Sequence, residues 1–205
     1  MPARRDNSEF PARQPAEGEF VEPDTATAEK AYRSIRNMTD DVPKVAEALD
    51  LDPSVVDVAK RNLFVNKHDV AVGGGDIVHG YFTADDYIAG LWKSAMAGKL
   101  KVPNEFNELR SVIAHEYVEA KLMEAGVPYN YADPRLWDDV DGYGDSTEHV
   151  GAHTVAPRAL QATNNLELLL SHWEGHGLTP PPGGLAPDLS NLDDIVQRAI
   201  EGMGW

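Results

Sequence analysis

The sequence of 205 residues contains no cysteine, and none of its apolar runs approaches the length of a membrane span, about 18 residues. Without cysteine there can be no disulfide, thiolate zinc finger or cysteine nucleophile, so histidine, aspartate and glutamate must carry any metal or acid–base chemistry. The polar N-terminus also lacks the apolar core of a signal peptide. We therefore predict a soluble protein with no membrane contact, cytoplasmic unless a specialised secretion system exports it.

Positive charge is scarce, because 18 lysines and arginines stand against 34 aspartates and glutamates, a formal net charge of -16. Binding to a phosphate backbone depends on basic side chains, so duplex DNA is not an expected partner. A basic protein or a cognate inhibitor protein is compatible with the charge. An enzyme that cleaves RNA stays open, since a local basic patch can form on an acidic body.

The spacing of apolar residues predicts a mainly α protein: a compact helical domain with a small hairpin or loop insertion near residues 66–82. Prolines and charges interrupt every period in residues 1–24, which we predict to be a disordered leader without a packed hydrophobic role. Residues 25–177 form the predicted helical, catalytic-like domain, and residues 178–205 a Pro/Gly-rich linker with a terminal helix. Helices are expected over 25–38, 42–49, 53–65, 84–97 (capped by Thr83), 104–125 and 155–173.

The predicted helix over 104–125 carries the pattern His-Glu-x-x-Glu at His115, Glu116 and Glu119. At 100 degrees per residue, Glu116 falls inside the apolar sector of the helix, and His115 and Glu119 lie one turn apart on its flank. A carboxylate buried without a partner costs several kcal/mol, so Glu116 requires a partner, a raised pKa or a water-lined pocket. We predict that it is at least half buried, with His153, His68 or a metal-bound water in hydrogen-bonding reach.

This pattern resembles the zinc-peptidase motif, in which two histidines four residues apart bind the metal and the intervening glutamate activates water. Here Glu119 takes the second ligand position, and three protein ligands suffice for a catalytic zinc site. His153 is the preferred third ligand, with His149 and His68 behind it. Metal-free acid–base chemistry by His68, Glu116 and the same cluster, and a purely structural polar cluster, remain open alternatives.

A wider series of residues resembles a C-terminal module of bacterial polymorphic toxins and phage minor head proteins. It comprises Asn62-Leu63-Phe64, His68, Tyr81-Phe82, a helix with Trp92, the His-Glu helix, Gly126 and Ala152-His153, and covers roughly residues 31–160. Asn62 stands where the module has a histidine and Tyr81 where it has an arginine. The segment between Gly126 and Ala152 is also longer than in the module. The resemblance implies a toxin-like or effector enzyme, and the departures imply that it is an altered or inactive relative if either missing side chain is essential.

Three functions therefore stay open. The first is a toxin-like hydrolase with His115, Glu119 and His153 around zinc or another divalent metal and Glu116 as general base. The second is a metal-free ribonuclease in which His68, His115 and His153 exchange protons with RNA. The third is a non-enzymatic acidic helical adaptor in which Glu116 is a buried hydrogen-bonding residue.

Overall fold

A computed structural model describes residues 12–13, 19–22, 24–72, 76–132, 137–138, 142–143 and 150–205. The protein is mainly α, as predicted. Its elements are β1 (Ala12–Arg13), α1 (Ala26–Arg36), α2 (Asp41–Leu49), α3 (Pro53–Lys60), the π-helix η1 (Arg61–Val65), β2 (His68–Val72), β3 (Asp76–Gly80), α4 (Asp86–Met96), α5 (Pro103–Glu124), β4 (Trp137–Asp138), β5 (Gly142–Tyr143), α6 (Ala152–Val155), the 3-10 helix η4 (Leu166–His176) and α7 (Leu192–Met203). None of the helices in the described part of the chain is long and apolar enough to cross a membrane.

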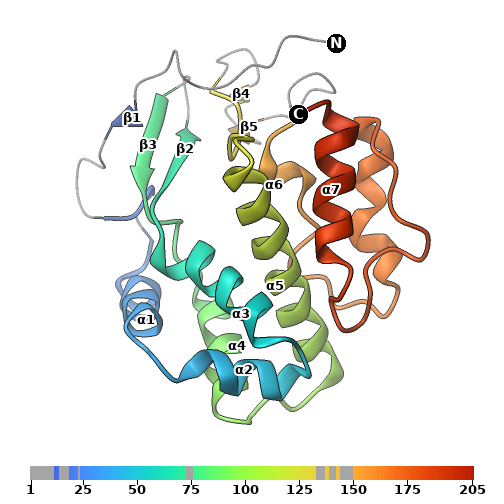
Figure 1. Cartoon of the computed structure of the whole chain (residues 1–205). Coiled ribbons are helices and arrows are strands. Elements are labelled where there is room, and N and C mark those ends of the chain that lie inside the picture. The colour runs from blue at the N-terminus through green and yellow to red at the C-terminus, as the bar shows by residue number, and fades with distance from the viewer. Residues whose placement is uncertain are drawn as a thin grey trace.

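The helix α5 runs through the middle of the molecule, with the β2–β3 hairpin on one side and α7 on the other (Figure 1). It packs against α3, α4, α6 and α7, and its residues Leu109, Ile113 and Leu122 are fully buried. Pro103 occupies the first turn, where the missing N–H costs nothing, and Gly126 just beyond the helix adopts a positive φ of 96°. The element predicted to carry the chemistry is therefore also the centre of the hydrophobic core.

The helices α1, α3 and α4 begin at a capping side chain, whereas the Asp40 side chain makes no capping hydrogen bond at the start of α2. The Thr25 hydroxyl accepts from the N–H of Ala28 at the start of α1. At the start of α3, the Asp52 carboxylate accepts from the N–H of Ser54. The predicted cap of α4 at Thr83 is wrong, because the Asp85 carboxylate accepts from the N–H of Ile88 at 2.9 Å and the helix begins two residues later than expected.

A buried ion pair connects three of these helices. The Lys60 ammonium of α3 lies 2.7 Å from the Asp41 carboxylate of α2, and the Trp92 indole N–H of α4 donates to the other oxygen of Asp41 at 2.9 Å. The Asp41 side chain is completely buried, and each of its oxygens has a partner. This satisfied cluster fixes α2, α3 and α4 to one another beside α5.

The predicted hairpin is present as β2 and β3, which pair antiparallel from His68 opposite Gly80 to Val72 opposite Asp76. The strand β1 adds to β3 in parallel on the other side. Phe20, which is only 4% exposed, packs in the main core. The prediction that residues 1–24 lack a packed hydrophobic role is therefore wrong at Phe20, and residues 12–13 form a strand rather than a disordered segment. Residues 1–11, 14–18 and 23 lie outside the described residues.

The chain after α5 departs from the predicted helix over 155–173. Instead, the four-residue α6 ends at Val155, and an irregular segment leads to η4 at Leu166. Ala156 is extended, with a ψ of 148°, as steric conflict with the following Pro157 requires. Most of the segment between α5 and α6 falls outside the described residues. Leu178 and Leu185 of the expected linker are buried in the main core, and α7 packs on α5.

Candidate metal centre

The middle of α5 brings three polar side chains into the interior. His115 and Glu116 are each 7% exposed, and Glu119 is 1% exposed. The burial of Glu116 confirms what the helical projection predicted. His115 and Glu119 lie deeper than the flank position expected for them, because α6 and the segment after it cover that side of the helix.

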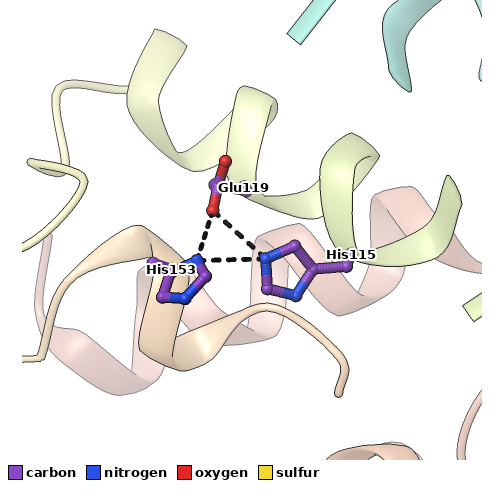
Figure 2. A group of neighbouring side chains, drawn as sticks. All are labelled: His115, Glu119 and His153. Carbon is purple, nitrogen blue, oxygen red and sulfur yellow. Dashed lines mark hydrogen bonds and ion pairs between the residues drawn. The ribbon is translucent and has the colours of Figure 1, made fainter. Parts of the chain in front are cut away.

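Three ligand atoms converge beside α5 (Figure 2). The Glu119 Oε2 atom lies 3.2 Å from His115 Nε2 and 2.8 Å from His153 Nδ1, and the two ring nitrogens are 3.2 Å apart. Nitrogen and oxygen ligands around a tetrahedral zinc ion lie roughly 3.4 Å from one another, given bonds of about 2.1 Å. An expansion of a few tenths of an ångström would therefore let these residues hold a metal ion.

The second nitrogen of His115 has a partner that orients the ring. His115 Nδ1 lies 2.8 Å from the backbone carbonyl of Pro157, which can only accept, so Nδ1 carries the proton and donates. Such a contact turns the Nε2 atom toward the cluster and raises its basicity, as is typical of metal-binding histidines. Pro157 thus both ends α6 and fixes the orientation of His115.

The charges of the cluster reinforce one another. Burial disfavours the imidazolium of His115, but the hydrogen bond and ion pair with Glu119 outweigh it and raise the pKa of His115 to about 9. Burial likewise opposes ionisation of Glu119, yet hydrogen bonds from His115 and His153 hold the pKa of Glu119 well below its usual range. In the metal-free protein at neutral pH, Glu119 is therefore ionised and His115 is protonated.

His153 comes from the short helix α6, which is fastened to the segment after α5. The backbone N–H groups of Ala152 and His153 donate to the carbonyls of Pro128 and Tyr129 at 2.8 and 3.0 Å. Gly151 permits this approach, because a Cβ there would lie 2.4 Å from the Tyr129 carbonyl oxygen. The Tyr129 ring also stacks on the His153 imidazole, with centroids 4.7 Å apart. The His153 side chain remains 51% exposed, so the cluster has one open side.

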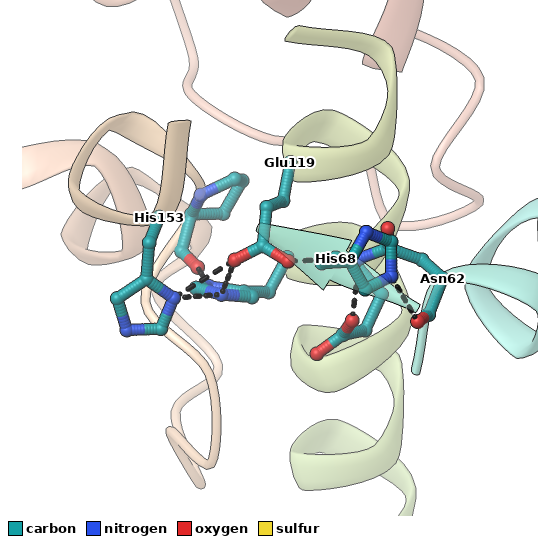
Figure 3. A network of polar contacts seen from close by, with 7 residues as sticks. Asn62, His68, Glu119 and His153 are labelled. Carbon is teal, nitrogen blue, oxygen red and sulfur yellow. Dashed lines mark hydrogen bonds and ion pairs between the residues drawn. The ribbon is translucent and has the colours of Figure 1, made fainter. Parts of the chain in front are cut away.

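Asn62 connects Glu116 to the metal-ligand cluster, and Figure 3 shows Asn62 beside Glu119. Its side-chain nitrogen donates to Glu116 Oε2 and to Glu119 Oε1, each at 2.8 Å. Burial and the neighbouring charge of Glu119 raise the pKa of Glu116 to about 8. Of the partners predicted for Glu116, His153 and His68 bond elsewhere in the described part of the chain and Asn62 donates instead, while a metal-bound water stays a prediction.

Asn62 reaches the carboxylates from the π-helix η1, where the N–H of Asn66 donates to the carbonyl of Arg61 at 2.8 Å. Sequence reasoning treated Asn62 only as a substitution for a histidine and missed this role. The sequence did carry an indication of this role. Asn62 follows an amphipathic helix, and a side-chain amide that is buried there needs a hydrogen-bond partner. π-turns of this kind occur frequently at functional sites.

His68, predicted as a catalytic residue, lies beside the trio but does not join it. Its Nε2 atom donates to the backbone carbonyl of Asn62 at 2.9 Å, and its ring stacks on Phe82 with centroids 4.3 Å apart. Burial lowers the pKa of His68, so it is neutral at pH 7. In this arrangement His68 holds the backbone of Asn62 in place and is a positioning residue.

The two remaining sequence features of interest lie elsewhere. Tyr81 packs under the guanidinium of Arg36, with Cζ 3.3 Å from the ring centroid, and takes no part in the cluster. His149, an alternative ligand, lies outside the described residues. Within the described part of the chain, His115, Glu119 and His153 form the group able to hold a metal.

The cluster opens into a cleft of about 540 Å³, to which Glu116, Glu119 and His153 contribute. The hydrophobic part of its wall comes from the hairpin and the segment after it, including Val70, Val72 and Phe82. The N-terminal residues Val21, Glu22 and Asp24 close another side. A substrate in this cleft would therefore contact Glu116 together with Glu119 and His153, two of the three candidate metal ligands.

Comparisons with known proteins add no relative. No known protein family matches the chain, and neither a curated protein nor a solved structure matches it. The resemblance to toxin and phage head modules stays a prediction.

Proposed function

We propose that this protein is a metal-dependent hydrolase. His115 Nε2, Glu119 Oε2 and His153 Nδ1 would bind a divalent ion, with zinc the best match to two imidazoles and one carboxylate. Three protein ligands with one open side is the arrangement of catalytic rather than structural zinc sites.

One observation carries the proposal: the three ligand atoms lie 2.8 to 3.2 Å apart, and two of the ligand residues, Glu119 and His153, line a cleft that Glu116 also lines. A structural polar cluster needs hydrogen-bonded partners but no access to a cleft. The exposure of His153 and the cleft therefore favour a site that exchanges ligands over the adaptor interpretation.

Each residue has a distinct role in this proposal. A bound divalent ion supplies a water of lowered pKa and polarises a substrate carbonyl. Glu116 would accept the proton of the attacking water in its ionised form, which the pKa of about 8 in the metal-free protein places at mildly alkaline pH, and would pass that proton to the leaving group. Asn62 donates to Glu116 and Glu119 at the same time and so holds the base beside the ligand. His115 is kept in its ligating orientation by the Pro157 carbonyl.

The lining of the cleft favours hydrolysis of a peptide over cleavage of RNA. Its described residues include the carboxylates of Glu22, Asp24 and Asp85 besides Glu116 and Glu119, and no lysine or arginine. A phosphate backbone would face these negative charges without a counter-charge from the wall. An uncharged peptide bond meets no such repulsion.

The test is cleavage of a proteome-derived peptide library by zinc-loaded protein, read by mass spectrometry, with metal content measured in parallel. We expect one zinc per chain and cleavage by the wild type. Glu116→Gln keeps the zinc but lowers the rate by about 10² to 10⁴-fold, since it preserves shape and removes the base. His153→Ala should lose both the bound zinc and the peptide cleavage. Cleavage that persists in Glu116→Gln, or wild type that binds no zinc, refutes the proposal.

A further inference from the structure

The cleft contains a buried hydroxyl that the proposed mechanism does not use. Tyr32 of α1 is 1% exposed and lines the cleft, and its hydroxyl oxygen makes no hydrogen bond of ordinary length and angle in the free protein, although the Asp85 backbone lies near enough to lower its pKa. A buried polar group left without a partner is costly and uncommon. Its position at the cleft wall indicates that a ligand group completes it.

Negative charge surrounds this hydroxyl. Burial and then the charge of Glu116 raise the pKa of Tyr32, the Asp85 backbone lowers it, and the charges of Asp85 and Asp24 raise it further. All three carboxyl groups line the same cleft, as does Glu22, and no lysine or arginine is present among the described lining residues. A cation would therefore be stabilised there, whereas an anion would be repelled.

Apolar surface accompanies the carboxylates. Ile88 and Phe82 line the cleft beside Asp85, so an aliphatic chain ending in a cation finds both kinds of contact. Lysine and arginine side chains have this composition, with an apolar stem and a charged head. An ammonium or guanidinium group donates hydrogen bonds only, and the Tyr32 oxygen can accept one of them.

We propose that the part of the cleft formed by Tyr32, Asp24 and Asp85 is a specificity subsite for a lysine or arginine side chain of the peptide substrate. This inference rests on the proposed hydrolase function for the identity of the scissile bond. The binding of the cation itself depends only on the subsite. Hydrolysis and subsite recognition can therefore be measured separately.

The experiment measures binding to zinc-loaded full-length Glu116→Gln protein, in which slow chemistry leaves the peptide intact. A fluorescein-labelled Ala/Gly peptide with one lysine is compared by anisotropy with the same peptide carrying norleucine or glutamate in that position. We expect the lysine peptide to bind about tenfold more tightly than the norleucine peptide, as one charge-assisted hydrogen bond provides. The difference should shrink as salt is raised.

Asp85→Asn, made in the same background, tests the subsite without disturbing the fold, because asparagine caps a helix as well as aspartate does. It should lower lysine-peptide affinity several-fold and leave norleucine-peptide affinity unchanged. Asp52→Asn is the matched control: it caps α3, changes the net charge equally and lies outside the lining of this cleft. It should have no effect on either peptide.

Tyr32→Phe is a second test variant. It should weaken binding of the lysine peptide without lowering the stability of the protein. Removing an unpartnered hydroxyl should keep or raise the melting temperature, while lysine-peptide affinity falls. The subsite is refuted if the lysine and norleucine peptides bind equally, if neither binds, or if Asp85→Asn matches Asp52→Asn. If Glu116→Gln binds the lysine peptide tightly and selectively but the wild type hydrolyses no peptide, the hydrolase proposal alone is refuted.

Discussion

Adding zinc to the metal-free protein should stabilise it strongly, because the ligands belong to separate parts of the folded chain. His115 and Glu119 lie on α5, and His153 lies on α6, 34 residues after Glu119, so the unfolded chain does not present them together. A ligand that binds only the folded state stabilises it by about 4 kcal/mol at a thousandfold excess over Kd. For a protein of this size, that corresponds to a rise in melting temperature of roughly 8 to 16 °C.

The stabilisation by zinc should increase with pH. In the metal-free protein, by contrast, the contribution of His115 and Glu116 to stability should decrease with pH. The folded pKa of His115, about 9, and that of Glu116, about 8, both exceed the ordinary values of 6.5 and 4.5. Each folded group therefore retains its proton where the unfolded group has lost it, so their contribution to stability falls as pH rises through these windows. Zinc must displace the His115 proton, so its affinity rises about tenfold per pH unit below 9, or ~1.4 kcal/mol.

The assay is thermal unfolding with zinc and with EDTA at pH 6, 7 and 8. We expect the gap between the two melting temperatures to widen with pH. His153→Ala should abolish it, and since this side chain is half exposed the fold should survive. His79→Ala is the matched control, because His79 is also partly exposed and lies outside the ligand group. Equal melting temperatures with zinc and EDTA, or an undiminished gap in His153→Ala, would refute the metal site.

Three further predictions concern the scaffold. Phe20→Ala should lower the free energy of unfolding by about 3 to 5 kcal/mol in urea titrations, because it empties a core position; a loss below about 1 kcal/mol would show that residues 19–22 dock too weakly to shape the cleft. Lys60→Met should cost about 3 to 5 kcal/mol by leaving Asp41 buried without its cation, and chemical denaturation that matches the wild type would contradict this. Gly151→Ala should keep the helical circular dichroism but weaken zinc binding at least tenfold in calorimetry, because the new Cβ pushes His153 away; unchanged affinity would be inconsistent with the close contact.

Local patterns predicted the parts of the fold that depend on nearest neighbours. Apolar spacing located the helices up to Glu124, although the cap expected for α4 was wrong, and the projection of α5 placed Glu116 in the interior. The helix expected over 155–173 failed because apolar residues after Val155 suggested a helical period, although Pro157 disfavours a helical conformation at Ala156.

The site was predictable only as a set of residues. His115 and Glu119 share one helix face, so their proximity follows from α-helix geometry. The approach of His153 depends on tertiary contacts of Gly151 with the segment after α5, which no local pattern reveals. Asn62 escaped notice for the same reason, since its two carboxylate partners lie 54 and 57 residues away.

The π-turn that presents Asn62 gives the site a dependence on chain length as well as on residue identity. A π-turn closes with an i→i+5 hydrogen bond, so it holds one residue more than an α-turn. Deleting a single residue within Arg61–Val65 would restore an ordinary turn and rotate the rest of the segment by about 100 degrees relative to α3. The amide would then lose its position between the two carboxylates even if an asparagine remained in the sequence. Relatives that share the chemistry should therefore align here without a gap, and a one-residue gap would mark those that have lost it.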